Sequence, residues 1–99
     1  MNKKGLKTME ITDVKIRRTF DDGPMKAIAS VTFDNALVVH DIKVIYARES
    51  FFIVMPSRKL PDGRFQDIAH PTDCATRALL EKAVLDAYQV YLIANEVNV

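Results

Sequence analysis

Two segments near the start of the chain alternate apolar and polar residues with the period of two that a β-strand produces. Residues 9–19 are followed by Asp21-Asp22-Gly23-Pro24, and residues 25–33 are followed by Asp34-Asn35. Both polar clusters favour tight turns, because glycine tolerates positive φ and proline cannot donate to a strand ladder. Alternation on both sides of tight turns predicts consecutive antiparallel strands.

Two further apolar segments extend this meander. Residues 37–46 are apolar on both sides with few polar exceptions, which is typical of a central strand covered on both faces. Residues 51–55 are continuously apolar and predict a fourth strand, joined to the third through residues 46–50. Residues 64–69 predict a short fifth strand.

A helix is expected to follow the strands. Pro71-Thr72-Asp73 offers a cap and a negative charge suited to a helix N-terminus. Residues 74–93 contain neither glycine nor proline, and their apolar residues recur at helical spacing. The predicted stripe consists of Leu80, Val84, Ala87, Tyr88 and Tyr91. The sequence therefore predicts an α+β fold in two layers, a curved antiparallel β-sheet of four to five strands followed by one long C-terminal helix.

The length of 99 residues fits one domain. We expect a flexible N-terminal arm at residues 1–8, a single α+β domain at residues 9–93 and a frayed tail at residues 94–99. The formal net charge is only +1, so overall charge gives no argument for nucleic acid.

Cysteine content and hydropathy limit the class of protein. The single cysteine, Cys74, excludes an intramolecular disulfide and a cysteine-based zinc cluster, and we expect it to be buried or half-buried. No segment approaches the roughly 20 apolar residues that span a bilayer. No apolar core follows the N-terminal lysines, so we expect a cytoplasmic protein without membrane insertion.

Three cations lie around the predicted turn Pro61-Asp62-Gly63. They are Arg58, Lys59 and Arg64. Arginine grips phosphate through two hydrogen bonds and lysine adds a point charge, so the loop predicts a site for phosphate or another anion. The alternative is a solvated turn whose cations keep the protein soluble. Three aromatic residues flank the loop, and we expect core packing rather than base stacking for Phe51, Phe52 and Phe65.

A second basic segment lies in the first predicted strand. Regular alternation puts Lys15 and Arg17 on one face and Arg18 on the other, so we do not expect all three to face one ligand. They are predicted as secondary basic contacts, or as charges that guard a sheet edge.

Only His40, Asp41 and His70 resemble a catalytic constellation. Neighbours on a strand point to opposite faces, which argues against His40 and Asp41 acting together. We expect structural histidines whose ring nitrogens bond nearby backbone, although two histidines and a carboxylate leave a small metal-dependent hydrolase as a remote alternative. We therefore expect no enzyme, no catalytic residue, no metal, no cofactor and no small-molecule substrate.

Several of these segments, taken in order, resemble the stage V sporulation protein G, or septation-protein, family. The resemblance runs from about Met9 to Tyr88 without a gap. Its main pieces are Glu10-Ile-Thr-Asp-Val-Lys-Ile-Arg-Arg18, Met25-Lys-Ala-Ile-Ala-Ser30, Val38-Val-His-Asp-Ile-Lys-Val-Ile45, Met55-Pro-Ser-Arg-Lys59, Pro61-Asp-Gly63 and Asp67-Ile-Ala-His-Pro71. The resemblance implies a small bacterial regulator of septation, sporulation or related gene expression that binds DNA or RNA and forms a homodimer.

The resemblance also implies where nucleic acid would bind. In this family, DNA binding is linked to basic residues near the Met-Pro-Ser segment and the following helix. The matching residues of this sequence are Arg58, Lys59 and Arg77. We add Arg64 from its charge and position alone. Residues 46–50 depart from the Asp-Gly and Asn-rich turn of typical members. We expect dimerisation through strand pairing, and the alternative function is a non-enzymatic protein-interaction adaptor in cell division or envelope control.

Overall fold

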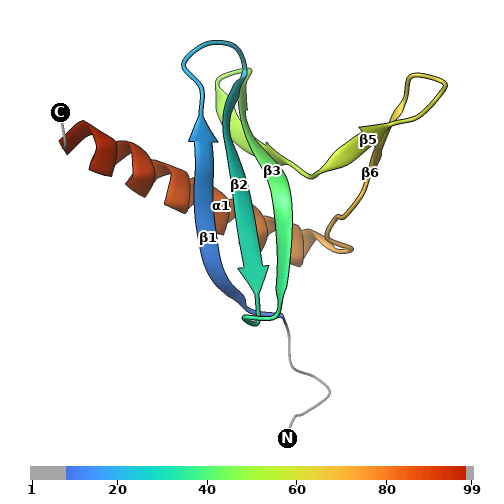
Figure 1. Cartoon of the computed structure of the whole chain (residues 1–99), viewed down its shortest axis with the longest axis horizontal. Helices are drawn as coiled ribbons and strands as arrows, with labels where there is room; N and C mark the ends of the chain where they lie inside the picture. Colours follow the sequence, from blue (N-terminus) through green and yellow to red (C-terminus); the bar gives the residue numbers. More distant parts are fainter. Residues whose placement is uncertain (1–8, 98–99) are drawn as a thin grey trace, which may run out of the picture.

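The computed structural model describes residues 9–97, and the side chains of residues 9–94, as a four-stranded antiparallel sheet, a separate two-stranded hairpin and one helix (Figure 1). The predicted α+β fold class is confirmed. The elements are β1 (Ile11–Thr19), β2 (Met25–Phe33), β3 (Leu37–Ala47), β4 (Ser50–Val54), β5 (Ser57–Lys59), β6 (Phe65–Asp67) and α1 (Cys74–Val97).

The four strands of the main sheet follow one another in space as they do in the chain, in the order β1-β2-β3-β4. The predicted turns between them are confirmed. Gly23 lies at φ 80 between β1 and β2. Asp34 and Asn35 lie at φ 53 and 52 between β2 and β3, as the central residues of a primed turn require, and the Ala36 N–H closes this turn on the Phe33 carbonyl over 2.9 Å.

The turn between β3 and β4 is tighter than the sequence predicted. Residues 46 and 47 belong to β3 and residue 50 belongs to β4, so only Arg48 and Glu49 form the connection. Their φ values are 52 and 64. The left-handed region is unfavourable for both residue types, since Cβ approaches the following carbonyl oxygen.

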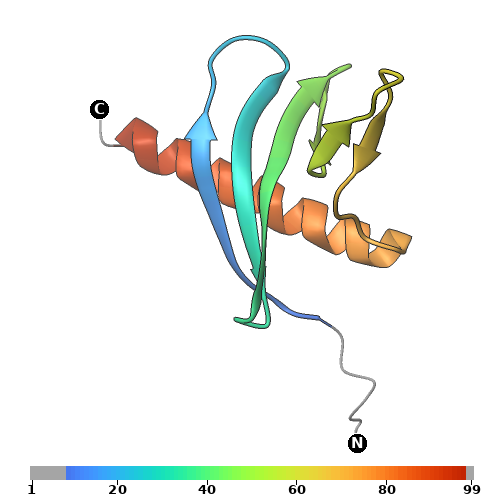
Figure 2. The same cartoon turned by 45° about the vertical axis from the view of Figure 1, so that its right-hand side comes forward.

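The core lies between one face of the sheet and α1, which crosses that face diagonally (Figures 1 and 2). Along β2, where alternation was predicted, every second residue from Ala27 is buried, namely Ala27, Ala29, Val31 and Phe33. From the helix, Leu80, Val84 and Tyr88 close the core against residues of β3 and β4. The alternation of β2 and the helical spacing of α1 therefore predicted the buried face of each element correctly.

The opposite face of the sheet, which we name the open face, turns away from α1 (Figure 1). The prediction that the third strand is covered on both faces is wrong. β3 is central in the sheet, but the helix covers only one of its faces, and Val38, which pairs with Thr32 on the open face, is 43% exposed.

The helix begins where its predicted cap stands. The Thr76 backbone N–H donates to Asp73 Oδ1 over 2.6 Å, and this hydrogen bond lowers the pKa of Asp73 below its ordinary value. The helix runs to Val97, so the frayed tail predicted from residue 94 is wrong as far as 97. Residues 98–99 and the predicted arm at residues 1–8 lie outside the described residues. Cys74 is exposed, contrary to prediction.

Two helix side chains hold the outer edge of β4. Glu81 Oε2 accepts from the Ile53 N–H over 3.1 Å, and Arg77 Nη2 donates to the Ile53 carbonyl over 3.0 Å. The two residues are one helical turn apart and therefore reach the same point of the edge. Within residues 9–97, no helix is both long and apolar enough to cross a membrane.

Candidate nucleic-acid interface

The predicted basic loop is a hairpin of its own, which we name the basic hairpin (residues 57–67). β5 and β6 form a two-stranded sheet that stands away from the main sheet on the β4 side (Figures 1 and 2). The predicted fifth strand exists as β6, but it pairs with β5, a three-residue strand that the sequence did not indicate. Arg58 and Lys59 consequently lie on a strand, opposite Gln66 and Phe65.

The turn of the basic hairpin is closed by its own backbone. The Gly63 N–H donates to the Leu60 carbonyl over 2.9 Å, and the Leu60 N–H donates to the Arg64 carbonyl over 2.7 Å. Gly63 lies at φ 93, where a residue with a Cβ is strained. The predicted turn at residues 61–63 is therefore confirmed.

The three hairpin cations differ in their local partners. Arg64 Nε lies 2.7 Å from Asp62 Oδ2, and its backbone N–H donates to Oδ1 of the same residue. The ion pairs found among residues 9–94 include neither Arg58 nor Lys59. Arg58 and Lys59 therefore carry the uncompensated charge of the hairpin, and Asp62 partly neutralises Arg64.

Phe65 is the functional candidate that the sequence prediction missed. It was expected in the core, but it is 71% exposed and lies directly opposite Lys59. Its exposure could have been predicted from its position, because Phe65 directly follows a closed turn and β6 is too short to reach the core. Phe51 lies at the margin of the core, since its ring centroid is 4.6 Å from that of Tyr46 and 5.9 Å from that of Tyr88 but the residue is 37% exposed.

Arg77 lies in the first turn of α1 and is exposed. One of its guanidinium nitrogens bonds the Ile53 carbonyl, as described above. Arg77 therefore has a structural contact in addition to the binding role that the family resemblance implies.

The three cations of β1 do not follow the predicted alternation. In the register of β1 and β2, Lys15 lies opposite Ser30 and Arg18 lies opposite Ile28. Arg17 is an extra residue at a register shift between Ile16 and Arg18. Because Ser30 and Ile28 lie on the same face of β2, Lys15 and Arg18 share the open face. The prediction of opposite faces for Arg17 and Arg18 is wrong, since a bulge re-aims the side chains, and both line one shallow depression.

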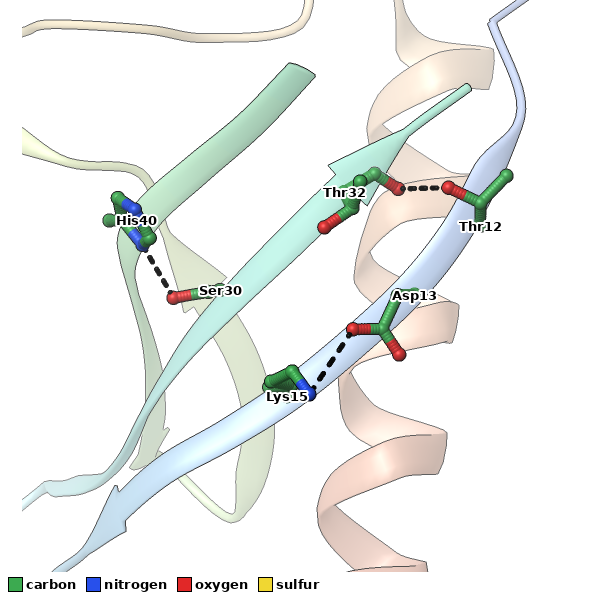
Figure 3. A network of polar contacts seen from close by, with 6 residues as sticks. All are labelled: Thr12, Asp13, Lys15, Ser30, Thr32 and His40. Carbon is green, nitrogen blue, oxygen red and sulfur yellow. Dashed lines mark hydrogen bonds and ion pairs between the residues drawn. The ribbon is translucent and has the colours of Figure 1, made fainter. Parts of the chain in front are cut away.

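His40 and Asp41 are displaced in the same way. The register between β2 and β3 shifts beside Ser30, and Asp41 lies at φ 66. Both residues line the depression that Arg17 and Arg18 line, so their predicted placement on opposite faces is wrong. His40 Nδ1 lies 2.8 Å from Ser30 Oγ, a side-chain partner rather than backbone (Figure 3).

His70 lies elsewhere, with Nδ1 2.9 Å from the Pro71 carbonyl, as expected for a histidine that bonds backbone. Among the described residues, no group of three or more His, Cys, Asp or Glu side chains could hold a metal ion.

Comparison with known proteins matches this chain to one family throughout its folded part. The model of the SpoVG family matches residues 9–90. A protein of Acetivibrio thermocellus named "Putative septation protein SpoVG" is 59% identical over 81 residues, which are 82% of this chain and 86% of the relative. A Clostridium perfringens protein of the same name is 60% identical over 81 residues, 82% of this chain and 90% of the relative. One from Caldicellulosiruptor bescii is 53% identical over 88 residues, 89% of this chain and all of the relative.

Proposed function

The chain belongs to the SpoVG family, and on that premise we propose that it is a cytoplasmic regulatory protein that acts in septation, sporulation or related gene expression by binding nucleic acid. The relatives are named septation proteins, which supports the cellular role. DNA and RNA are both proposed as ligands, and the protein is proposed to act without catalysis.

The observation that carries the binding proposal is the basic hairpin. Arg58 and Lys59 are exposed on β5, and neither is paired with a carboxylate among residues 9–94. Phosphate contacts from such side chains fix a protein on nucleic acid without selecting a sequence. Arg64 and Arg77 are proposed as further contacts of the same ligand, and Lys15, Arg17 and Arg18 as secondary contacts.

Phe65 gives the hairpin a contact that a charged loop alone lacks. An exposed aromatic ring beside cations can stack on an unpaired base while the cations hold the phosphates on either side. The ring lies opposite Lys59 on the neighbouring strand, so both residues can reach one ligand. The hairpin therefore suits nucleic acid with accessible bases.

The test is fluorescence anisotropy with labelled duplex DNA and labelled single-stranded RNA over a salt series. We expect wild-type affinity to fall steeply as salt rises, because each neutralised phosphate releases counterions. Arg58→Glu/Lys59→Glu should abolish binding to duplex DNA and weaken binding to the RNA, while circular dichroism and thermal unfolding stay unchanged. Lys82→Glu on α1 is the control, since Lys82 lies away from the hairpin and pairs with Asp86. Equal binding by wild type and the hairpin variant would refute the proposal.

A homodimer through strand pairing is proposed as well. Exposed edge strands pair with other chains unless they are blocked. β1 has a strand neighbour only on its β2 side in the described sheet, whereas side chains of α1 occupy the edge of β4 at Ile53. Light scattering after size exclusion should give twice the chain mass of 11.2 kDa. A mass of one chain at micromolar concentration would rule the dimer out.

A protein-interaction adaptor is the second candidate, and one surface favours it. Met9, Ile11 and Leu79 line a groove of about 610 Å³ between the start of β1 and α1, and Leu79 is 57% exposed. Exposed apolar surface of this kind marks sites of protein contact. Loss of function in cells on Leu79→Asp, with nucleic-acid binding intact in vitro, would favour the adaptor over the regulator.

A further inference from the structure

The open face of the sheet carries a row of residues that are paired directly across all four strands. Arg18 pairs with Ile28, Ile28 with Lys43, and Lys43 with Val54. Directly paired residues share a face, and the neighbours of Ile28 in β2, Ala27 and Ala29, are buried on the helix side. The row therefore lies on the open face, with one cation on β1 and another on β3.

Two irregularities in strand register bring further polar side chains to this row. One shift adds Arg17 to β1 next to Ile28, and the other adds a residue to β3 at His40 and Asp41. Arg17, Arg18, His40 and Asp41 line a depression of about 430 Å³ around Ile28. Bulges re-aim side chains and are frequent beside functional sites, and Asp41 adopts at this shift a left-handed φ of 66, which aspartate tolerates better than most residues.

Two of these side chains are held before any ligand arrives. His40 Nδ1 lies 2.8 Å from the hydroxyl of Ser30, which is 6% exposed (Figure 3). The Arg18 guanidinium carbon lies 5.2 Å from the centre of the Phe20 ring, a cation–π contact. A side chain that is already ordered loses less conformational entropy on binding.

The charge of the open face is cationic. Lys15 has one partner, Asp13, at 3.9 Å (Figure 3), whereas the ion pairs of residues 9–94 involve neither arginine of the bulge nor Lys43. Among the described residues, Asp41 alone contributes a carboxylate to the depression. Its oxygens repel a phosphate placed against them but accept from a ribose hydroxyl or a base amino group. Cations beside one carboxylate therefore suit a sugar-phosphate chain better than an isolated anion.

Half-buried apolar side chains continue the open face towards β4. Ile45 pairs with Phe52, and the ring of Phe52 lies on the side opposite the buried neighbour Ile53. Cations next to an apolar platform with an aromatic ring are the arrangement that binds single strands, because bases stack on it without regard to sequence.

We propose that the open face is a second nucleic-acid-binding surface, separate from the basic hairpin, and that it takes a single strand. Arg17, Arg18 and Lys43 hold phosphates, and the apolar platform at Phe52 contacts bases. This proposal rests on the function proposed above, and it assigns Lys43, His40 and Phe52 to the same ligand. It also makes the bulge of β1 the element that turns Arg17 towards that ligand.

The test compares Arg17→Glu with Lys82→Glu, two exposed single charge reversals on opposite layers of the molecule. The probe is a labelled uridine oligomer of about 12 nucleotides, within the range of single-strand site sizes. Because both variants change net charge equally, a difference between them reports a contact. We expect Arg17→Glu to reduce the slope of log affinity against log salt by about 0.7 for each phosphate lost, and Lys82→Glu to match wild type. Arg17→Gln should give the same loss of slope.

The outcomes separate this inference from the proposed function. Equal slopes for Arg17→Glu and Lys82→Glu, with binding abolished by Arg58→Glu/Lys59→Glu, overturn the open-face site and leave the basic hairpin intact. Weakening by Arg17→Glu on duplex DNA but not on the oligomer also overturns it. Failure of the wild type to bind either nucleic acid at low salt overturns both proposals.

Discussion

Replacing Glu49 with glycine should stabilise the protein, because Glu49 lies at φ 64 in the two-residue turn between β3 and β4. The left-handed region costs a residue with a Cβ roughly 1–2 kcal/mol. Glycine avoids that cost but loses more backbone entropy on folding, which offsets roughly 0.5–1 kcal/mol. We therefore expect a net gain of about 0.5–1 kcal/mol. In a domain of this size such a gain raises the melting temperature by about 2–8 °C.

Urea unfolding followed by circular dichroism at fixed protein concentration measures the effect, with an unchanged m-value as the sign that only stability moved. Gly23→Ala is the matched reverse change. Gly23 lies at φ 80, and nothing lies within 4 Å of an added Cβ, so only backbone conformation is perturbed and the variant should lose about 1 kcal/mol. If Glu49→Gly is no more stable than wild type while Gly23→Ala is destabilised, the argument from φ fails at this turn.

Four other changes test the interface, the core, the β4 edge and the helix cap. Phe65→Ala should weaken single-strand binding by the roughly 1–3 kcal/mol of one stacked base without lowering the melting temperature; unchanged anisotropy would contradict the stacking role. Val84→Ala removes core atoms that are fully buried, and calorimetry should show a loss of roughly 2 kcal/mol. Glu81→Ala leaves the Ile53 N–H without its carboxylate, and urea unfolding should show a loss of about 1–2 kcal/mol. The pKa of Asp73 is lowered by the Thr76 N–H, so the cap stabilises the helix above the ordinary aspartate pKa of about 3.9 and this contribution is lost as pH falls through the lower folded value. Thermal melts of wild type and Asp73→Ala should therefore converge in strong acid, and a constant difference at all pH values would disprove the linkage.

The sequence predicted the features that depend on near neighbours in the chain. The inward alternation of β2 and the cap at Asp73 are local, and the structure has both where they were expected. The turn at Asp34-Asn35 is local for the same reason, since both residue types tolerate a left-handed φ.

Features that depend on several strands at once were not predictable. The bulge at Arg17 and the register shift at His40 exist only relative to β2, so a strict period of two misplaced these side chains. Phe65 was assigned to the core because it is aromatic, whereas its exposure follows from the hairpin standing away from the sheet. The binding residues themselves rest on charge, position and family resemblance, and their role stays a prediction.

The contacts of Arg77 and Glu81 with Ile53 give the sheet one free side, and this limits the symmetry of any assembly built by strand addition. A sheet with two free sides can add copies at both and grow into a fibre. With β4 occupied by the helix of its own chain, a second copy can join only at β1, edge to identical edge. In such an isologous contact each chain uses its one free side. Growth therefore ends at two chains, which form a continuous sheet of eight strands. The same two side chains would then set the stoichiometry of the assembly without touching its interface.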